Sequence, residues 1–461
     1  MLTSEQVRAK LSHPTIDCDG HMVEHLGLFA QFLNEQEPGL AERYRAYSQR
    51  VPLRGEGSLE GDFKWRYQQT PWWGHAAVTL DRATAYAPGL MYKRMDELGL
   101  DVMLLYPSLA LSMMMIPDAA MRIPVVTAVN RMLAEIWAPY SDRIIPAAAI
   151  PMYDVAETVE HLRTAAAMGH KLVAIPANVA RPIPGVHALA PGAYPSASWP
   201  DHYGLDTQDY GPVWAEAQRL KLAVSSHGNT SSRYVHSGRR SPTNFMFNHI
   251  GSHSYQQGEL TRSLFMSGVT RRFPGMRIAA LECGVSWAVQ MVMDLVERWE
   301  KRGGDHIQQY DPARVDWPLF TSLLREHGGP RFANVELVED PMSHKGAPPH
   351  DDFGEVPCQS AEQLIKDFAD HFYFGCNSDD RGTSWAFRNP GGFVLKAMFA
   401  SDVAHWDVPN MANCVAESYE FITRDELNED EYRKLMFDHV AEYLRAANPD
   451  FFAGTIIADR F

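Results

Sequence analysis

The chain repeats one pattern along most of its length: a short apolar run of β-type composition, then a longer stretch with apolar residues at helical spacing. The eight runs that predict strands are Thr15–Asp19, Asp101–Tyr106, Ile144–Ile150, Lys171–Pro176, Leu222–His227, Arg277–Glu282, Phe372–Cys376 and Lys396–Asp402. The stretches that predict helices include Arg122–Ala138, Val155–Met168, Pro212–Leu220, Gln256–Arg272 and Ser286–Lys301. Strands separated by helices pair in parallel, so eight such units predict an α/β fold, the (β/α)8 TIM barrel.

Three connections in this pattern are longer than barrel loops usually are. A chain of 461 residues with 45% hydrophobic residues can fill one large barrel core. We therefore expect a single barrel domain over residues 1–461, with insertions at about 28–88, 178–210 and 303–370. The first insertion contains Trp65, Tyr67, Trp72 and Trp73, which favours a lid or the surface of a homodimer.

The charge balance excludes some classes of partner. The formal net charge of -15 argues against binding to nucleic acids or anionic membranes, because neither would be attracted to the average surface. The five cysteines are scattered and form no C-x-x-C pair, which indicates a reducing compartment. Residues 1–13 lack the apolar core of a signal peptide, and no run is long enough to span a membrane. These features predict a cytoplasmic enzyme with a small-molecule substrate.

The first predicted strand ends in a cluster of polar residues. Residues two apart in an extended segment point to the same side, so Asp19 and His21 can converge on one point. Asp17 shares their side, either as a third ligand or as a residue that holds a ligand in place. A solvated turn is the alternative interpretation of this motif.

Three further strands end in a polar residue: His227 closes the fifth, Glu282 the sixth and Asp402 the eighth. A single histidine at such a position is more often a core residue than a ligand. A charged residue at the end of a buried strand, however, has a high desolvation cost unless it meets a cation. Four such strand ends in one barrel predict a metal site.

At these positions the sequence resembles the amidohydrolase superfamily, in particular the amidohydrolase-2 family that contains aminocarboxymuconate-semialdehyde decarboxylase. The resemblance is carried by Ile16–His21, Ala223–His227, Arg272–Ile278, Leu281–Trp287, Ala400–Asp407 and Phe437–Leu444. It implies that Asp19 and His21 are the metal-binding pair of the first strand, that His227 is the fifth-strand ligand and that Asp402 is the eighth-strand aspartate.

The sequence departs from the common family pattern in two places. Many members have His-x-His where this chain has Asp19-x-His21. The decarboxylase type has a catalytic histidine where this chain has Glu282, which disfavours the decarboxylase mechanism and adds an anionic ligand. His253 matches a histidine found in many relatives, with His249 as a weaker substitute.

Together these residues predict a site for one or two divalent transition metal ions, Zn, Fe or Mn. The candidate ligands are Asp19, His21, His227, His253, Glu282 and Asp402. They outnumber the ligands of one four-coordinate site with an open position, so two ions are expected to fit. The fourth predicted strand does not end in lysine, so a carboxylate rather than a carbamylated lysine would bridge them.

The reaction expected from such a site is hydrolysis of an amide, lactone or thioester by a metal-activated water. Asp402 is the candidate for taking the proton of that water, and His253 or His405 for orienting the oxyanion or acting as the acid. A residue that only supports a ligand is the alternative for His405. The basic cluster Arg233–Arg240 would hold a carboxylate or the phosphates of an acyl-CoA, or be a solvated surface.

Two other functions stay open. One is non-oxidative decarboxylation or hydration of an aromatic or unsaturated carboxylic acid at the same site. The other is an inactive barrel that serves as a binding subunit, which the intact polar strand ends disfavour.

Overall fold

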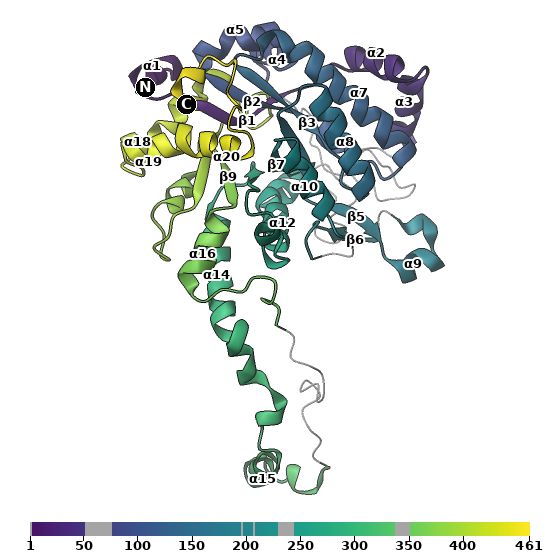
Figure 1. The fold of residues 1–461 in the computed structure, drawn as a ribbon, viewed down its shortest axis with the longest axis vertical. Helices are drawn as coiled ribbons and strands as arrows, with labels where there is room; N and C mark the ends of the chain where they lie inside the picture. The colour runs from purple at the N-terminus through teal and green to yellow at the C-terminus, as the bar shows by residue number, and fades with distance from the viewer. Residues whose placement is uncertain (1, 51–75, 195–196, 206–207, 229–243, 337–350) are drawn as a thin grey trace. The chain divides into compact units, whose positions relative to one another are not determined.

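Eight parallel strands form the barrel that the sequence predicts (Figure 1). The computed structural model describes residues 2–50, 76–194, 197–205, 208–228, 244–336 and 351–461. The strands, in their spatial order, are β1 (Ile16–Met22), β2 (Val102–Pro107), β3 (Ile144–Ala149), β4 (Leu172–Pro176), β7 (Ala223–His227), β8 (Ile278–Leu281), β9 (Phe372–Asn377) and β10 (Lys396–Ala400). Each predicted strand has its counterpart, and the TIM-barrel fold is confirmed.

The barrel closes where the last strand meets the first. The backbone N–H of Asp402 donates to the carbonyl of Asp19 at 2.9 Å, and the N–H of His21 donates to the carbonyl of Val403 at 3.0 Å. All residues of β1, β2, β4 and β7 are buried, as expected for parallel strands covered on both faces. The seam therefore joins two segments whose polar side chains were predicted to bind metal.

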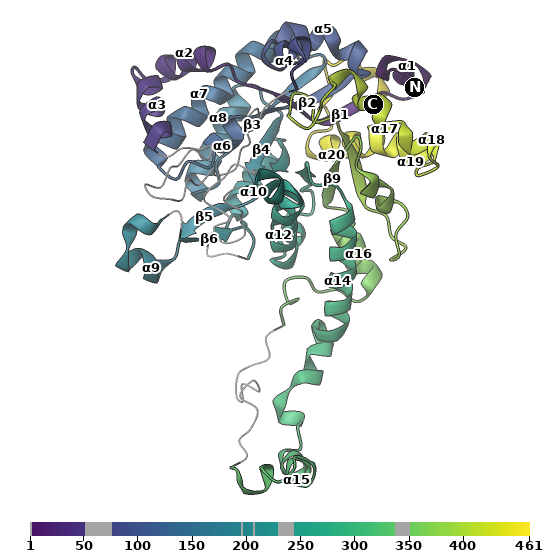
Figure 2. The ribbon, with the colours of Figure 1, turned by 180° about the vertical axis from the view of Figure 1, so that it is seen from behind.

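Helices fill much of the sequence between the strands. They are α1 (Ser4–Lys10), α2 (Leu26–Gln36), α3 (Leu40–Arg50), α4 (Thr79–Tyr86), α5 (Pro88–Leu98), α6 (Ala110–Met113), α7 (Ala119–Trp137), α8 (Val155–Ala167), α9 (Pro184–Leu189), α10 (Gly211–Arg219), α11 (Phe245–His249), α12 (Ser252–Met266), α13 (Val269–Arg272), α14 (Ser286–Arg302), α15 (Trp317–His327), α16 (Ala361–Ala369), α17 (Cys414–Ser418), α18 (Glu420–Thr423), α19 (Glu429–Arg433) and α20 (His439–Ala447). Helices α7, α8 and α10 follow one another along the strands β3, β4 and β7 (Figures 1 and 2). No helix in the described residues has the length and apolar character needed to cross a membrane.

The C-terminal helix α20 packs across the amino-terminal end of the barrel. Its residues Val440, Tyr443 and Leu444 share one buried cluster with Ile16 at the start of β1 and Ala223 at the start of β7. Strands β1 and β7 stand four places apart among the eight of the barrel order, so the helix spans opposite sides of it. The opposite, carboxyl end of the strands remains for a site.

The predicted helix Gln256–Arg272 is two helices in the structure. Gly268 adopts a φ of 70°, which ends α12 and allows α13 to start in a new direction. The first predicted insertion contains most of α2 and all of α3 and α4, and the second contains an antiparallel pair, β5 (Val179–Pro182) and β6 (Ser198–Asp201).

The chain separates into two compact units, residues 1–291 with 367–461, and residues 292–366. The second unit contains α15, which has no buried residue.

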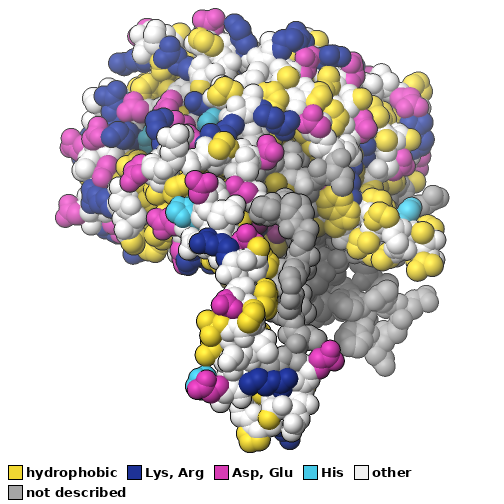
Figure 3. All heavy atoms as spheres, turned by 60° about the horizontal axis from the view of Figure 1, so that its bottom comes forward, with side chains coloured by type: hydrophobic (Ala, Val, Ile, Leu, Met, Phe, Trp, Pro, Cys, Tyr) yellow, Lys and Arg dark blue, Asp and Glu magenta, His cyan; other side chains and the backbone are white. Residues whose placement is uncertain are grey.

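The prediction of one barrel domain with three insertions stays a prediction, as does the homodimer. The aromatic residues Trp65–Trp73 and the basic cluster Arg233–Arg240 lie outside the described residues. On the face drawn in Figure 3, acidic and basic side chains are interspersed over the barrel unit.

Candidate metal centre

Strand β1 brings Asp19 and His21 to the barrel mouth, although not in the regular way that the sequence predicts. The strand was expected to end at Asp19 but runs to Met22, with an irregularity in its pairing with β2 between Asp17 and Gly20. A side chain at position 20 would displace its neighbours, because a Cβ there would lie 2.6 Å from Met103 Sδ and 2.8 Å from Asp17 Oδ2. The irregularity and the close packing fix the direction of the two candidate ligands.

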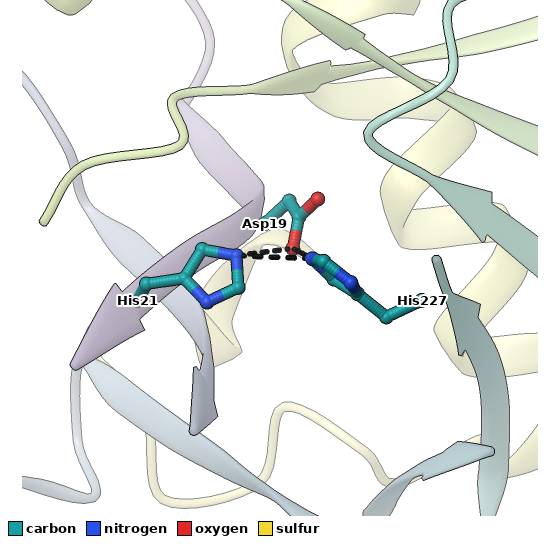
Figure 4. A group of neighbouring side chains, drawn as sticks. All are labelled: Asp19, His21 and His227. Atoms are coloured by element: carbon teal, nitrogen blue, oxygen red, sulfur yellow. Dashed lines mark hydrogen bonds and ion pairs between the residues drawn. The ribbon is translucent and has the colours of Figure 1, made fainter. Parts of the chain in front are cut away.

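Four side chains from three strand ends converge on one point. His21 Nε2 lies 3.2 Å from His227 Nε2, 3.3 Å from Asp19 Oδ1 and 3.5 Å from Asp402 Oδ1. His227 Nε2 lies 3.9 Å from Asp19 Oδ1 (Figure 4). Ligands that share one ion at about 2.0–2.2 Å are separated by roughly 3.0–3.5 Å, so most of these distances suit a common cation.

These four side chains are almost completely buried, with exposed fractions of 0 to 2%. Within the described part of the chain, neither oxygen of Asp19 nor Asp402 Oδ2 has a hydrogen-bond partner, while Asp402 Oδ1 contacts His405. Burial raises the pKa of both carboxyl groups well above the usual range. Ionised carboxylates in such a place need a cation, so this donor set fits a divalent metal ion.

Burial favours the neutral form of His21 and His227, which is the form that binds a metal ion. Burial lowers the pKa of His227 to about 4 and that of His21 well below its usual value. His227 Nδ1 lies 2.6 Å from the carbonyl oxygen of Gly228, which fixes the Nδ1–H tautomer. Its Nε2 lone pair then points towards His21 and is available to a metal.

Asp17 lies behind the ligands rather than among them. Its carboxylate accepts hydrogen bonds from the Ser401 N–H at 2.9 Å, the Ser401 hydroxyl at 2.5 Å and the Asp19 N–H at 3.1 Å. Burial raises the pKa of Asp17 to about 6, although these hydrogen bonds oppose the shift. Of the two roles expected for Asp17, its contacts fit the one of holding a ligand in place.

Asp402 is held in an unusual backbone conformation. Its φ is 51°, and that of Glu282 is 50°, both in the left-handed region that residues other than glycine rarely adopt. His405 Nδ1 lies 2.6 Å from Asp402 Oδ1, and its ring stacks on His21 with centroids 3.6 Å apart. Ser108 Oγ lies 3.2 Å from His405 Nε2 on the other side of the ring. These contacts fit a positioning role for His405.

Glu282 and His253 border the four converging side chains. Glu282 Oε2 lies 3.3 Å from both His227 Nε2 and His253 Nδ1, and its Oε1 lies 3.9 Å from His249 Nε2. Burial, then the charges of Asp407 and Asp19, raises the pKa of Glu282 well above its usual value. The structure thus brings all six predicted ligands together.

Two residues of this region were not assigned a role from sequence. His249 was considered only as a substitute for His253, yet both lie near Glu282. Asp407 was given no role in the sequence analysis, and its carboxylate lies within 4.8 Å of ligand atoms of His249 and Glu282. The signal available in the sequence was the short segment Asp402–Asp407, in which three of six residues can bind metal.

Comparison with known proteins agrees with this fold. The family model described as amidohydrolase (Amidohydro_2) matches residues 16–331, and no curated protein matches. An amidohydrolase from Mycobacterium avium subsp. paratuberculosis K-10 has 15% identity and a TM-score of 0.54, over 94% of this chain and 100% of that one.

Two decarboxylase structures have the same fold. Dihydroxybenzoic acid decarboxylase from Polaromonas sp. JS666, with bound manganese and 2-nitroresorcinol, has 13% identity and a TM-score of 0.52, over 96% of this chain and 99% of that one. A mutant of 5-carboxyvanillate decarboxylase from Novosphingobium aromaticivorans DSM 12444, also with manganese, has 12% identity and a TM-score of 0.51, over 95% of this chain and 98% of that one. Because the family match covers more than half of its length, the chain belongs to the amidohydrolase-2 family of the amidohydrolase superfamily.

Proposed function

We propose that this protein is a metal-dependent enzyme that removes CO2 from a small aromatic or unsaturated carboxylic acid. The observation that carries the proposal is the convergence of Asp19, His21, His227 and Asp402 at the carboxyl ends of the strands. In the described residues, the ion-pair partners of the two buried carboxylates are histidines and not lysine or arginine. The manganese-containing decarboxylases of the same fold support this reaction above hydrolysis.

Asp19, His21, His227 and Asp402 would hold the cation, with manganese as the first candidate and zinc or iron as the others. A divalent cation at this place supplies Lewis-acid polarisation of a substrate oxygen. His405 keeps the Asp402 carboxylate directed into the site through the contact at 2.6 Å.

Glu282 and His253 are the candidates for the proton that the reaction needs. Decarboxylation breaks the bond between the carboxyl group and the substrate carbon, the electron pair stays on that carbon, and a proton replaces the CO2. Burial raises the pKa of Glu282, which favours the protonated form that a proton donor needs. Glu282 would thus serve where the decarboxylase type uses histidine.

Hydrolysis of an amide, lactone or thioester is the second candidate reaction, and Glu282 is again the residue that favours it. An ionised Glu282 would accept a proton from water, a role that carboxylates commonly have in metal-assisted hydrolysis. The two reactions differ in whether CO2 leaves, so the product distinguishes them.

The test is turnover of carboxyl-labelled 2,6-dihydroxybenzoate and 5-carboxyvanillate by manganese-loaded enzyme, followed as labelled bicarbonate by 13C NMR. A parallel panel contains a lactone, an aryl amide and an acyl-CoA. We expect labelled bicarbonate from the wild type, and a rate at least about 100-fold lower in the Asp402→Asn variant. The control Asp450→Asn removes one negative charge from an exposed residue, and it should leave the rate unchanged.

Each contrary result has a definite meaning. Turnover in the hydrolysis panel without bicarbonate from the acids would replace decarboxylation by the second candidate. A protein that binds no manganese, zinc or iron and turns over nothing would be the inactive barrel.

A further inference from the structure

The second compact unit contains a segment, residues 304–336, that is folded without a core of its own. None of these residues is buried, although the segment includes α15. Its large apolar side chains that are 37–54% exposed are Tyr310, Val315, Leu319, Leu323, Phe332 and Val335. An isolated helix of 11 residues, the length of α15, is marginally stable in water unless an apolar face is buried. The α15 segment, residues 304–336, therefore needs a partner surface.

The open part of α15 is a stripe formed by two leucines. Leu319 and Leu323 are 54% and 45% exposed. They are four residues apart in the helix, so they lie one above the other on the same face. Trp317 and Phe320, in contrast, are partly covered, and their ring centroids lie 5.4 Å apart. The face with Leu319 and Leu323 is thus the apolar side of the helix that remains available to a partner.

The charges of the segment suit a second copy of the same segment. The formal net charge of the chain is -15, so two copies repel each other over most of their surface. Residues 311–335, however, contain three acidic and three basic residues and have no net charge.

The two ends of α15 carry opposite charges. Asp316 caps the first turn and accepts a hydrogen bond from the Leu319 N–H at 2.9 Å, whereas Arg325 lies in the last turn. In an antiparallel pair of α15 helices, the acidic start of one helix faces the basic end of the other. The two helix dipoles then also oppose each other, which is the favourable arrangement.

The apolar surface is large enough for a specific contact. The half-exposed side chains of the segment present on the order of 500 Å² of apolar surface in each copy, near the upper end of what a monomer usually leaves open. Two copies would bury about 1,000 Å², the lower limit for a specific interface. A contact between identical helices in antiparallel orientation has two-fold symmetry and closes on itself as a dimer.

We propose that the α15 segment is a self-association surface, on which the α15 helices of two copies of the protein pack antiparallel through Leu319 and Leu323. The sequence favoured the first insertion for a homodimer surface, so the proposal assigns the contact to a different part of the chain. It goes beyond the proposed function and is independent of it, because none of the proposed metal ligands lies within residues 304–336.

Sedimentation equilibrium of the full chain tests this contact. We expect a monomer–dimer equilibrium with a dissociation constant on the order of 1–10 µM, because the interface is at the small end of the range. Leu323→Glu places an unpaired charge inside the contact and should raise the dissociation constant at least about 100-fold. The matched control Thr321→Glu adds the same charge at an exposed position on the opposite face of α15, and it should leave the constant nearly unchanged.

Distances between spin labels test the orientation of the two helices. Packed helices lie about 8–10 Å apart, so labels at Ser322→Cys, near the middle of α15, should be within about 30 Å of each other in the dimer. Labels at His327→Cys, the last residue of the helix, should be farther apart, because antiparallel packing separates the two ends. Protein without the added cysteine gives the background from the native cysteines.

Each contrary result overturns a definite part of the proposal. A monomer at about 100 µM would overturn it and would mean that the segment packs within its own chain. A dimer that Leu323→Glu leaves intact would place the contact elsewhere. Equal weakening by Thr321→Glu would mean that added charge, not the leucine stripe, controls association. A shorter distance for His327→Cys than for Ser322→Cys would exclude antiparallel packing. None of these results bears on metal binding or turnover, which test the proposed function separately.

Discussion

At the scale of single residues, the candidate centre depends on side chains that hold the ligands as much as on the ligands. Asp17 binds the backbone of Ser401 and Asp19, and His405 binds Asp402. Such supporting groups fix ligand direction, and their removal typically lowers metal affinity about 10–100-fold.

His405→Ala should therefore weaken manganese binding about 10–100-fold without unfolding the barrel. His405→Asn should recover part of this loss, because the amide nitrogen of asparagine can take the place of Nδ1 and donate to Asp402. Titration calorimetry measures both affinities. Equal affinities in the wild type and His405→Ala would show that the contact to Asp402 does not orient this ligand.

Gly20→Ala should destabilise the protein by about 1–3 kcal/mol, because the new Cβ has no space beside Met103 and Asp17. The control is Gly185→Ala, where an added Cβ would meet nothing within 4 Å and which should change stability by less than about 0.5 kcal/mol. Urea midpoints compare the two variants. A midpoint for Gly20→Ala equal to that of the control would mean that β1 makes room for the new Cβ without a loss of stability.

The candidate ligands at strand ends were identifiable because a polar residue that closes an apolar run marks the carboxyl edge of a barrel. Asp19, His227, Glu282 and Asp402 all carry this signal. Asp407 does not, because it lies in a loop with no regular spacing, and only the folded chain brings it to Glu282.

At the scale of elements, the strands were the most predictable part, because most are short buried runs rich in apolar residues, such as β2 (VMLLYP) and β8 (IAAL). The end of β1 was predicted too early, since Gly20 and the irregular pairing interrupt the strand pattern. The helices of the first insertion were not predicted. Helix α3, with the sequence LAERYRAYSQR, is too polar to show a clear apolar stripe.

Helix α8 offers a test of pH dependence through the buried His161. Burial lowers its pKa to about 4, below the ordinary value of 6.5. The unfolded chain therefore takes up this proton first as the pH falls, and stability is lost between about pH 6.5 and pH 4. His161→Leu should lose less stability than the wild type between pH 7.5 and pH 5, measured by urea midpoints. An identical loss in both proteins would exclude a contribution from His161.

At the scale of the whole molecule, the proposed ligands of the metal ion tie together strands from the start, middle and end of the chain. Bound metal should therefore stabilise the entire barrel rather than one loop. Free manganese at 100 times its dissociation constant should add about 2.7 kcal/mol to the free energy of unfolding, by mass action. Chelation should remove this gain.

Thermal unfolding with manganese or with chelator measures the effect in the wild type and in Asp19→Asn. The variant should show a much smaller difference between the two conditions, because it lacks one proposed ligand. A difference as large in Asp19→Asn as in the wild type would mean that the stabilising ion binds elsewhere.

The two sides of the barrel seam, β1 and the segment after β10, are synthesised at different times. Asp17 and Ser401, which hold its two sides, are 384 residues apart. The ribosome synthesises Asp19 and His21 long before Asp402, so these two residues remain without it while the strands in between are made. A nascent or truncated chain can thus offer only part of the first coordination shell. Loading of the proposed cation would then follow the synthesis of Asp402 and its pairing with Asp19 at the seam.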